Sequence, residues 1–283
     1  MTQLYSDKSE SEEKQLFKQL KPPFKEGKEA IWAQLAEQME EGPAPKRRII
    51  PISILRIAVA ASFLLILTAT LFARFYTTLQ QTTLGEQLVA SLPDGSEVRM
   101  NSGSTLSYAP YWWYFDRRVQ LEGEAYFEVQ KGSKFTVVSS LGQTSVLGTS
   151  FNINTQDGQY LVFCATGKVA VSTPKAQLIL IPGEIATRQS DGQLNKSSAA
   201  KEKVAAWVAQ KFSFEEQPLQ LVLKAFERRY AVAIEFDAAI GDMTYSAFYK
   251  QPENIEEALE LICLSFNLKF NRLHSKKYQL SKQ

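Results

Sequence analysis

The order of hydrophobic and polar positions gives the chain four successive patterns. Apolar residues first recur at helical spacing, then form one continuous run over residues 57–73, IAVAASFLLILTATLFA, which has no charge, proline or glycine. Short alternating runs follow, and near the C-terminus alternating and helical spacings take turns. At about 1.5 Å per residue the continuous run would cover roughly 26 Å as a helix, close to the hydrocarbon thickness of a bilayer. We therefore expect a multi-domain membrane protein with one transmembrane helix, at residues 49–76.

Basic residues cluster on one side of this segment. Lys46, Arg47 and Arg48 precede it, whereas Arg74 is followed by a long uncharged tract. Lys and Arg concentrate on the cytoplasmic side of membrane spans, so this cluster is a topology signal that places the N-terminus in the cytoplasm and the C-terminal bulk outside it. Arg56 lies close enough to the helix end for its side chain to reach the interface. A buried helix of a soluble core and a signal peptide remain as alternatives, although about fifty residues precede the run and no A-x-A-like site follows it.

Residues 1–48 are expected to form a short helical cytoplasmic segment. Ser9 and Glu12 have capping-box spacing ahead of a first helix, and Pro22 and Pro23 separate it from a second helix over residues 25–41. The second helix carries a single apolar stripe, made of Ile31, Trp32, Leu35 and Met39. So short a segment buries little core. The stripe is therefore either packed on the first helix, with Trp32 covering Phe17 and Leu20, or available to a partner.

The region from residue 77 to 187 has short apolar runs between turn signals spaced near ten residues apart. Examples of the turn signals are Pro93-Asp94-Gly95, Asp157-Gly158 and Ile181-Pro182-Gly183. This texture predicts an all-β domain, placed at 85–187, and both a sandwich and a short β-solenoid fit it. The aromatic run 111–115 (YWWYF) is expected in a loop or at a strand edge, with a membrane-surface patch as the alternative. Three carboxylates are expected on one solvated strand face: Glu122, Glu124 and Glu128.

Residues 188–206 are small and polar, and we expect a linker that leads into a short helix near Trp207. Residues 207–283 contain an internal repeat of strand, helix and strand, followed by a last hairpin that turns near His274. The first helix follows Pro218, and the second begins with Asn254 as cap and Glu257 as its box partner. These patterns predict a small α+β domain built from two βαβ units.

The composition offers little chemistry. The formal net charge of +2 at pH 7 gives no electrostatic reason for direct binding of nucleic acid. His274 is the single histidine, and no Cys, His or carboxylate cluster has metal-ligand spacing, so neither a metal nor another cofactor is expected. Phosphate-binding glycine motifs are absent from the sequence too, and we do not expect an enzyme. Cys164 and Cys263 are expected to be two independent buried thiols rather than a disulfide.

Five segments of the all-β region stand in the order and spacing of the FecR-like anti-sigma factors, which the chain resembles. They are LPDGSEVRMNSGSTLSY (92–108), LEGEAYFEV (121–129), VLGTSFNI (146–153), TGKVAVS (166–172) and IPGE (181–184). The C-terminal repeat resembles the domain that closes the Bacteroidetes-type members, which is similar to the short N-terminal domain of secretins and TonB-dependent receptors. The resemblance covers about residues 85–280, and the N-terminal segment departs from it in being shorter than the family's usual cytoplasmic domain.

This resemblance implies a single-pass protein of the inner membrane, with a cytoplasmic N-terminus and a periplasmic bulk. The cytoplasmic segment would bind an extracytoplasmic-function sigma factor. The periplasmic part would read the state of an outer-membrane TonB-dependent transporter through that transporter's signalling domain, for which exposed strand edges offer a docking mode. The alternative is a membrane-anchored periplasmic scaffold or binding protein without a sigma partner. A periplasmic hydrolase is disfavoured, because the catalytic constellation is missing.

Two sets of residues follow as candidates for function. We expect the stripe Ile31, Trp32, Leu35 and Met39 to bind the sigma factor, because burial of an apolar helix face favours docking and Trp often carries such contacts. The resemblance also implies possible self-cleavage at Gly148-Thr149, where some members of the family cut their own chain by an N-to-O acyl shift. The alternative there is structural, with Gly148 supplying a turn and Thr149 starting a strand.

Overall fold

The computed structural model describes residues 14–15, 17–18, 27–40 and 51–282. The chain divides into two units, residues 1–62 and residues 63–283, and the description below treats each by itself. In the first unit, Lys14, Gln15, Phe17 and Lys18 are helical, and helix α2 runs from Lys28 to Glu40. Both helical stretches lie where the capping and stripe patterns predicted them. The basic topology signal, Lys46 to Arg48, lies outside the described residues.

Helix α3 (Ile52–Phe75) is long and apolar enough to cross a membrane. It has 24 residues, and none of them is buried in the protein. The hydroxyl groups in the middle of the helix bond to its own backbone: Ser62 Oγ donates to the Ala58 carbonyl at 2.8 Å and Thr70 Oγ1 donates to the Ile66 carbonyl at 2.7 Å. An uncovered apolar helix whose central hydroxyl groups are satisfied internally is suited to a lipid environment.

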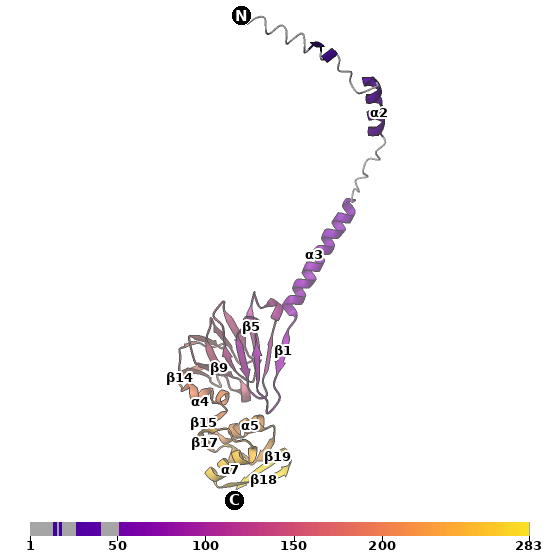
Figure 1. The fold of residues 1–283 in the computed structure, drawn as a ribbon. Coiled ribbons are helices and arrows are strands. Elements are labelled where there is room, and N and C mark those ends of the chain that lie inside the picture. Colours follow the sequence, from indigo (N-terminus) through magenta and orange to yellow (C-terminus); the bar gives the residue numbers. More distant parts are fainter. Residues whose placement is uncertain (1–13, 16, 19–26, 41–50, 283) are drawn as a thin grey trace. The chain divides into compact units, whose positions relative to one another are not determined.

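Residues 78–198 form a domain of two seven-stranded sheets, called the β domain below (Figure 1). The first sheet has the order β1 (Thr78–Gln81), β4 (Thr105–Tyr108), β5 (Arg117–Glu122), β7 (Phe135–Val138), β8 (Gln143–Val146), β11 (Val169–Ser172) and β12 (Gln177–Leu180). The second has the order β14 (Leu194–Ser198), β13 (Glu184–Arg188), β10 (Leu161–Cys164), β9 (Ser150–Asn154), β6 (Glu124–Glu128), β3 (Glu97–Met100) and β2 (Leu88–Ser91). Within residues 78–198, β5 and β7 are the only neighbours that pair in parallel. Short 3₁₀ turns lie at Pro110–Trp112 (η1) and Gln156–Gly158 (η2).

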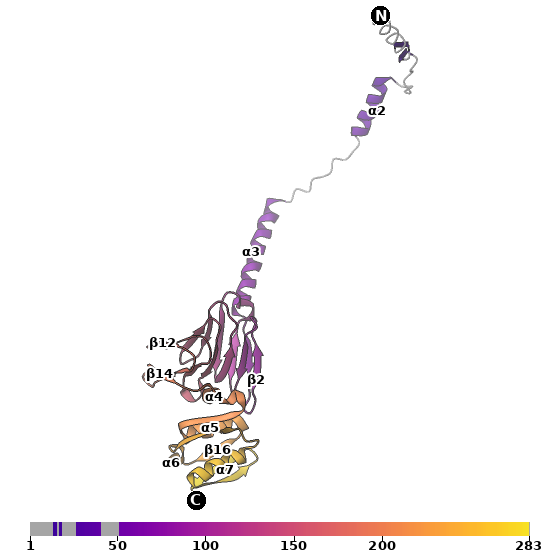
Figure 2. The ribbon, with the colours of Figure 1, turned by 60° about the vertical axis from the view of Figure 1, so that its left-hand side comes forward.

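The two sheets of the β domain share one hydrophobic core. Val119 and Phe135 of the first sheet and Phe127 and Phe151 of the second are all fully buried in the same cluster. Phe127 and Phe151 stack with their ring centroids 4.9 Å apart. Burial of such side chains contributes about 1.5–3 kcal/mol each to stability. Of the two architectures that the sequence left open, the structure has the sandwich (Figure 2).

The boundary of the β domain differs from the predicted one at both ends. Strand β1 begins at Thr78, seven residues before the expected start at 85, and β14 lies inside the segment 188–206 that was expected to be a linker. β14 pairs with β13 along five residue pairs and closes one edge of the second sheet. Its sequence, LNKSS, is polar because most of its side chains are exposed, so no apolar alternation marks it.

A connecting segment, residues 199–210, leads to the C-terminal domain. It contains α4 (Lys201–Val204) and the 3₁₀ turn η3 (Ala206–Ala209), close to the predicted short helix. Ala205 and Trp207 are buried against Tyr126 of β6. The connection is therefore packed on the β domain rather than free.

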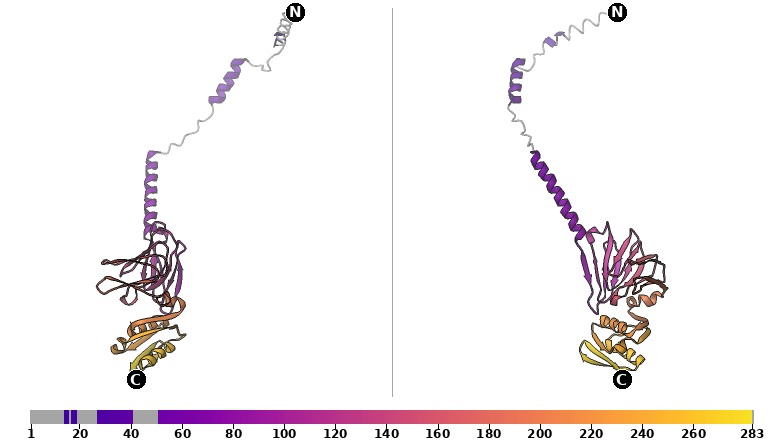
Figure 3. Two further views of the ribbon diagram at one scale, coloured as in Figure 1. Left: turned by 90° about the vertical axis from the view of Figure 1, so that its left-hand side faces the viewer. Right: turned by 180° about the vertical axis from the view of Figure 1, so that it is seen from behind.

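The C-terminal domain, residues 211–282 (orange to yellow in Figure 3), has the predicted strands and helices in the predicted order, and one short helix, α6, that was not predicted. The order is β15 (Lys211–Pro218), α5 (Leu219–Tyr230), β16 (Ala233–Phe236), α6 (Ala238–Gly241), β17 (Thr244–Lys250), α7 (Ile255–Phe266), β18 (Leu268–His274) and β19 (Lys277–Lys282). β15 pairs with β17, and β19 lies between β16 and β18. The prediction of two βαβ units is therefore wrong, because a βαβ unit joins two strands of one sheet, whereas β15 and β16 lie in different sheets, and so do β17 and β18. Asn254 caps α7 by accepting the Glu257 amide at 3.0 Å, as its spacing predicted. The buried stripes of α5 and α7 meet in one core.

Candidate functional site

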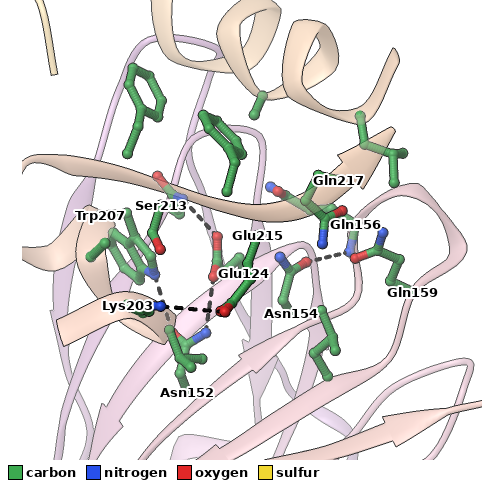
Figure 4. A pocket seen from close by; sticks show the side chains of 18 of the residues that line it. Glu124, Asn152, Asn154, Gln156, Gln159, Lys203, Trp207, Ser213, Glu215 and Gln217 are labelled. Atoms are coloured by element: carbon green, nitrogen blue, oxygen red, sulfur yellow. Dashed lines mark hydrogen bonds and ion pairs between the residues drawn. The ribbon is translucent and has the colours of Figure 1, made fainter. Parts of the chain in front are cut away.

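A cleft of about 540 Å³ opens between the β domain, the connecting segment and the C-terminal domain (Figure 4). Strand ends and turns of the second sheet supply its floor, Lys203 and Trp207 one wall, and β15 and α5 the other. Its side chains are mostly polar. Those that carry the argument below are Asn101, Glu124, Asn152, Asp157, Trp207 and Arg228.

Glu124 is the buried carboxylate of this cleft, with only 8 % of its surface exposed. It accepts hydrogen bonds from Asn101 Nδ2 at 2.8 Å and from Asn152 Nδ2 at 2.9 Å. Burial raises the pKa of Glu124 above its ordinary value, although the two amides and the charge of Arg228 work in the opposite direction. A carboxyl group so placed links three segments of the second sheet and carries a charge that depends on pH.

Trp207 extends this network into the connecting segment. Its indole Nε1 donates a hydrogen bond to Asn152 Oδ1 at 3.2 Å, while the same amide donates to Glu124 (Figure 4). A buried indole N–H usually finds such a partner. The contact ties the segment between the domains to the floor of the cleft.

The prediction that Glu122, Glu124 and Glu128 share one solvated face is wrong. Gly123, with φ +102°, lies between two strands. Glu122 therefore belongs to β5 of the first sheet and Glu124 to β6 of the second. A Cβ at position 123 would lie 2.7 Å from Ser104 Cα. Two strands joined through one glycine look like a continuous alternating strand in the sequence, and this concealed the buried carboxylate.

Charged and polar contacts join the C-terminal domain to the end of the β domain that holds the cleft. Arg228 Nη1 of α5 lies 2.9 Å from Asp157 Oδ2, and the Lys224 ammonium lies 3.7 Å from the other oxygen of the same carboxylate. The Gly85 amide donates to the Arg228 carbonyl at 2.7 Å. These contacts hold helix α5 against loops of the β domain.

The cleft is lined by groups that can bind polar partners. Neither histidine nor cysteine is among the described residues that line it, and the described part of the chain has no group of three or more His, Cys, Asp or Glu that could hold a metal. Amides, one buried carboxyl group and flanking cations can bind polar groups or hold two domains in one arrangement.

Two segments of the chain match models of known protein families. Residues 79–170 match the model described as "FecR protein", and residues 211–280 match the model described as "FecR, C-terminal". The chain belongs to the FecR family. The first match covers strands β1 to β11 of the β domain, and the second covers nearly all of the C-terminal domain. The resemblance seen in the sequence is thereby confirmed.

Two solved structures, each of a candidate anti-sigma factor from Parabacteroides distasonis, resemble this FecR protein. One has 28% identity and a TM-score of 0.69, and covers 74% of this chain and 100% of its own. The other has 28% identity and a TM-score of 0.68, and covers 73% of this chain and 99% of its own. No curated protein matches the chain at a significant level. The family and these structures support a sigma-regulator role for the FecR protein.

The predicted sigma-binding stripe is exposed on α2. Trp32 is 63% exposed, Leu35 46% and Met39 79%, while Ile31 is partly buried. Phe17, which Trp32 was alternatively expected to cover, is itself 73% exposed. Leu20, the other residue of that alternative, lies outside the described residues. Within the described part of the FecR protein, the apolar face of α2 is thus available.

Gly148 and Thr149 lie in the turn between β8 and β9 of the FecR protein. Gly148 has φ +150°, and a Cβ there would come within 2.6 Å of Lys131 Cα. The Thr149 hydroxyl is buried and has no hydrogen-bond partner among the described residues. Thr149 directly precedes strand β9, as the structural alternative requires. The geometry therefore fits a turn and also leaves an unpaired nucleophile beside the Gly148 carbonyl.

The remaining reactive groups are placed apart from the cleft. Cys164 and Cys263 are free thiols, the first buried and the second half-buried. Burial raises the pKa of Cys164 to about 11, which keeps it protonated and unreactive at neutral pH. His274 ends strand β18 and is exposed.

Proposed function

We propose that this FecR protein is a single-pass inner-membrane anti-sigma factor whose N-terminus is cytoplasmic. Residues 1–48 bind an extracytoplasmic-function sigma factor, and the part after α3 lies in the periplasm. The observation that carries the proposal is the exposed apolar face of α2, only a short distance along the chain from a helix able to span a membrane. The family and the solved structures support the regulator role.

An exposed Trp on a short amphipathic helix favours a partner groove. Burial of apolar surface is favourable by roughly 25 cal/mol per Å², and Trp at the centre of an interface is often worth about 2 kcal/mol or more. Trp32, Leu35 and Met39 project from successive turns of one face of α2, which is the spacing a helix-in-groove contact uses.

On the periplasmic side, the C-terminal domain receives the signal of a TonB-dependent transporter. Its two small sheets have outer strands that can accept another strand, β16 and β18 in one sheet and β15 and β17 in the other. Leu264 of α7 is 83% exposed and Leu261 is 40% exposed, on the face turned away from the core stripe. The unpaired edges of these outer strands and the exposed apolar face of α7 are both suited to docking of the transporter's signalling domain.

Co-purification tests the sigma contact. The tagged full-length chain is expressed with extracytoplasmic-function sigma factors of its own genome and purified from membranes. Trp32→Ala and Leu35→Asp are expected to abolish recovery of the sigma factor, without changing membrane level or helix content. Glu37→Ala is the matched control, because Glu37 is exposed on the opposite side of α2 and its loss leaves the apolar face intact.

Two outcomes would contradict this assignment. Recovery of the sigma factor with both variants would place the contact elsewhere in residues 1–48. Failure of the unmodified chain to recover any sigma factor would favour the alternative function, a membrane-anchored periplasmic scaffold or binding protein.

A second activity is favoured by the unpaired Thr149 hydroxyl: self-cleavage at Gly148-Thr149. The Thr149 Oγ attacks the Gly148 carbonyl carbon, the peptide C–N bond breaks as an ester C–O bond forms, and the hydroxyl proton passes to the freed amine. Water then hydrolyses the ester and leaves two fragments. The purified chain should run as two bands that Thr149→Ala merges into one. A single intact band for the unmodified chain would leave Gly148 its structural role in the turn.

A further inference from the structure

The strand registers place several loops of the β domain at the end where α3 arrives. Two residues separate β1 from α3, and Thr78 pairs with Tyr108, the last residue of β4. Tyr108 pairs with Val119 near the start of β5, and Arg117 pairs in parallel with Phe135 at the start of β7. The same end therefore holds the connections at 109–116 and 129–134. The opposite end of the domain carries the cleft and the C-terminal domain.

The remaining registers bring three further connections to this end. Phe135 pairs with Val146, the last residue of β8, and Val169, the first residue of β11, pairs with Leu180, the last of β12. The loops at 147–149, 165–168 and 181–183 thus join the first two. We call these five loops the helix-end surface.

Large apolar side chains stand exposed on the helix-end surface. Tyr114 is 91% exposed, Phe115 69%, Leu147 66% and Tyr111 62%. Ile181 is 49% exposed. In the run 111–115, only Trp113 turns inward, where it packs edge-on against Phe135 of the core. The other aromatics contribute nothing to the core of the domain.

Basic side chains on the same surface lack partners. Lys131, Lys134 and Lys168 are exposed and form no ion pair with any residue that the structure describes. Three of the carboxylates at this end are already paired with cations: Asp94 with Arg117, Asp116 with Arg118, and Glu184 with Lys196. A fourth carboxylate, Glu128, lies 3.9 Å from Arg99, whereas Glu97 is exposed and has no ion-pair partner among the residues that the structure describes. The free charge on these loops is therefore predominantly positive.

The end of α3 is continuous with this surface. The Phe72 and Tyr76 rings lie 6.2 Å and 5.3 Å from the Tyr111 ring, and the Arg74 guanidinium lies 5.6 Å from the Trp112 ring. Trp and Tyr are the residues that gather where a membrane span meets the headgroups, and Lys beside an anionic surface strengthens binding about fivefold per residue.

We infer that the helix-end surface lies on the headgroups of an anionic bilayer. This inference rests on the proposed membrane span and adds a second contact, made by the folded domain itself. Tyr111, Tyr114, Phe115 and Leu147 enter the interface, and Lys131, Lys134 and Lys168 lie over lipid phosphates. The β domain is thereby in contact with the membrane through its own side chains as well as being connected to it through α3.

A fluorophore tests this contact in the full-length chain, reconstituted at one copy per nanodisc. Cys263→Ser removes the accessible native thiol, and Cys164 is buried. An environment-sensitive label is attached at Tyr114→Cys or, as control, at Ser190→Cys in the exposed β13–β14 loop at the opposite end. The bilayer is phosphatidylcholine with or without added phosphatidylglycerol, and alkaline carbonate extraction of proteoliposomes reports whether the chain is anchored.

We expect the label at 114, but not at 190, to shift to the blue and to be quenched by headgroup spin-labelled lipid, more strongly with phosphatidylglycerol. Changing Lys131, Lys134 and Lys168 together to Gln should remove that lipid dependence. The matched control changes three lysines exposed in the connecting segment and the C-terminal domain to Gln, and should retain it: Lys201, Lys269 and Lys276.

An anchored chain with an aqueous label at 114 would overturn the inference and leave the membrane span intact. Equal shifts in both bilayers, or an unchanged response of the Lys131, Lys134 and Lys168 variant, would overturn the anionic-lipid contact. A chain that carbonate removes from the bilayer would overturn the span and this inference together.

Discussion

Arg228 of helix α5 and Asp157 of the turn between β9 and β10 form an ion pair between the C-terminal and β domains, with Nη1 2.9 Å from Oδ2. Both side chains are largely shielded from solvent, at 21% and 15% exposure. Asp157 adopts φ 54°, a left-handed conformation that Asp and Asn tolerate better than most residues. This ion pair is therefore one of the contacts that orient helix α5 against the neighbouring domain.

Asp157→Asn is expected to loosen this junction without disturbing the turn, because Asn keeps the shape and the left-handed conformation. The loss should be about 1 kcal/mol in the free energy of the docked arrangement. Hydrogen exchange measures it at the Gly85 amide, which donates to the Arg228 carbonyl and should exchange faster in the variant. Asp191→Asn, in an exposed loop, is the control. Unchanged exchange at Gly85 would show that the ion pair does not hold the domains together.

The pH dependence of stability should carry the signature of Glu124. Burial raises its pKa in the folded protein above the unfolded value of about 4.3. The folded state then binds the proton more tightly, so the free energy of unfolding falls as pH rises from the unfolded pKa through the folded one. Glu124→Gln removes this titration. Thermal unfolding in detergent across pH should show wild type losing stability relative to the variant as pH rises, and parallel curves would contradict the raised pKa.

Gly123→Ala is expected to destabilise the β domain strongly. Its φ of +102° costs an L-residue about 1–2 kcal/mol, and the added Cβ would also meet Ser104 backbone at 2.7 Å. Gly183→Ala is a matched control, with φ +85° but no atom within 4 Å of the added Cβ. Thermal unfolding should therefore show a larger loss for position 123 than for position 183. Equal losses would mean that Ser104 yields at little cost.

Topology can be read with alkaline phosphatase, which is active only outside the cytoplasm. Fusion after residue 85, within the β domain, should be active, and fusion after residue 40, at the end of α2, should not. The reason is the basic cluster at residues 46–48, which favours the cytoplasmic side. The reverse pattern of activity would end the anti-sigma proposal.

Local patterns were sufficient to predict the two long helices of the C-terminal domain and the order of its strands, but not how the strands pair. The stripes of α5 and α7 and the Asn254 cap depend on neighbours in the sequence, so periodicity located both helices. Strand β14 escaped prediction because its exposed LNKSS sequence has no apolar alternation and is a strand only through pairing with β13.

Strand pairing and hydrogen bonds between residues far apart in the sequence could not be predicted from it. Nothing local indicates that β5 pairs in parallel with β7, or that Trp207 bonds Asn152 from 55 positions away. The same holds for Glu124, whose burial follows from the change of sheet at Gly123. The order and spacing of the motifs identified the family. The cleft could not be predicted in this way, because its lining residues are far apart in the sequence.

The short passage from α3 into β1 has a mechanical consequence. Only Tyr76 and Thr77 separate the helix from the strand, and β1 lies at the edge of its sheet, held to β4 by four residue pairs. A force that pulls the C-terminal domain away from α3 would act first on this edge strand. Because that domain lies at the opposite end of the strands from α3, the force would run along β1 and load its bonds to β4 together, in shear, which requires more force than peeling them one after another. The sandwich thus takes up tension in its more resistant direction.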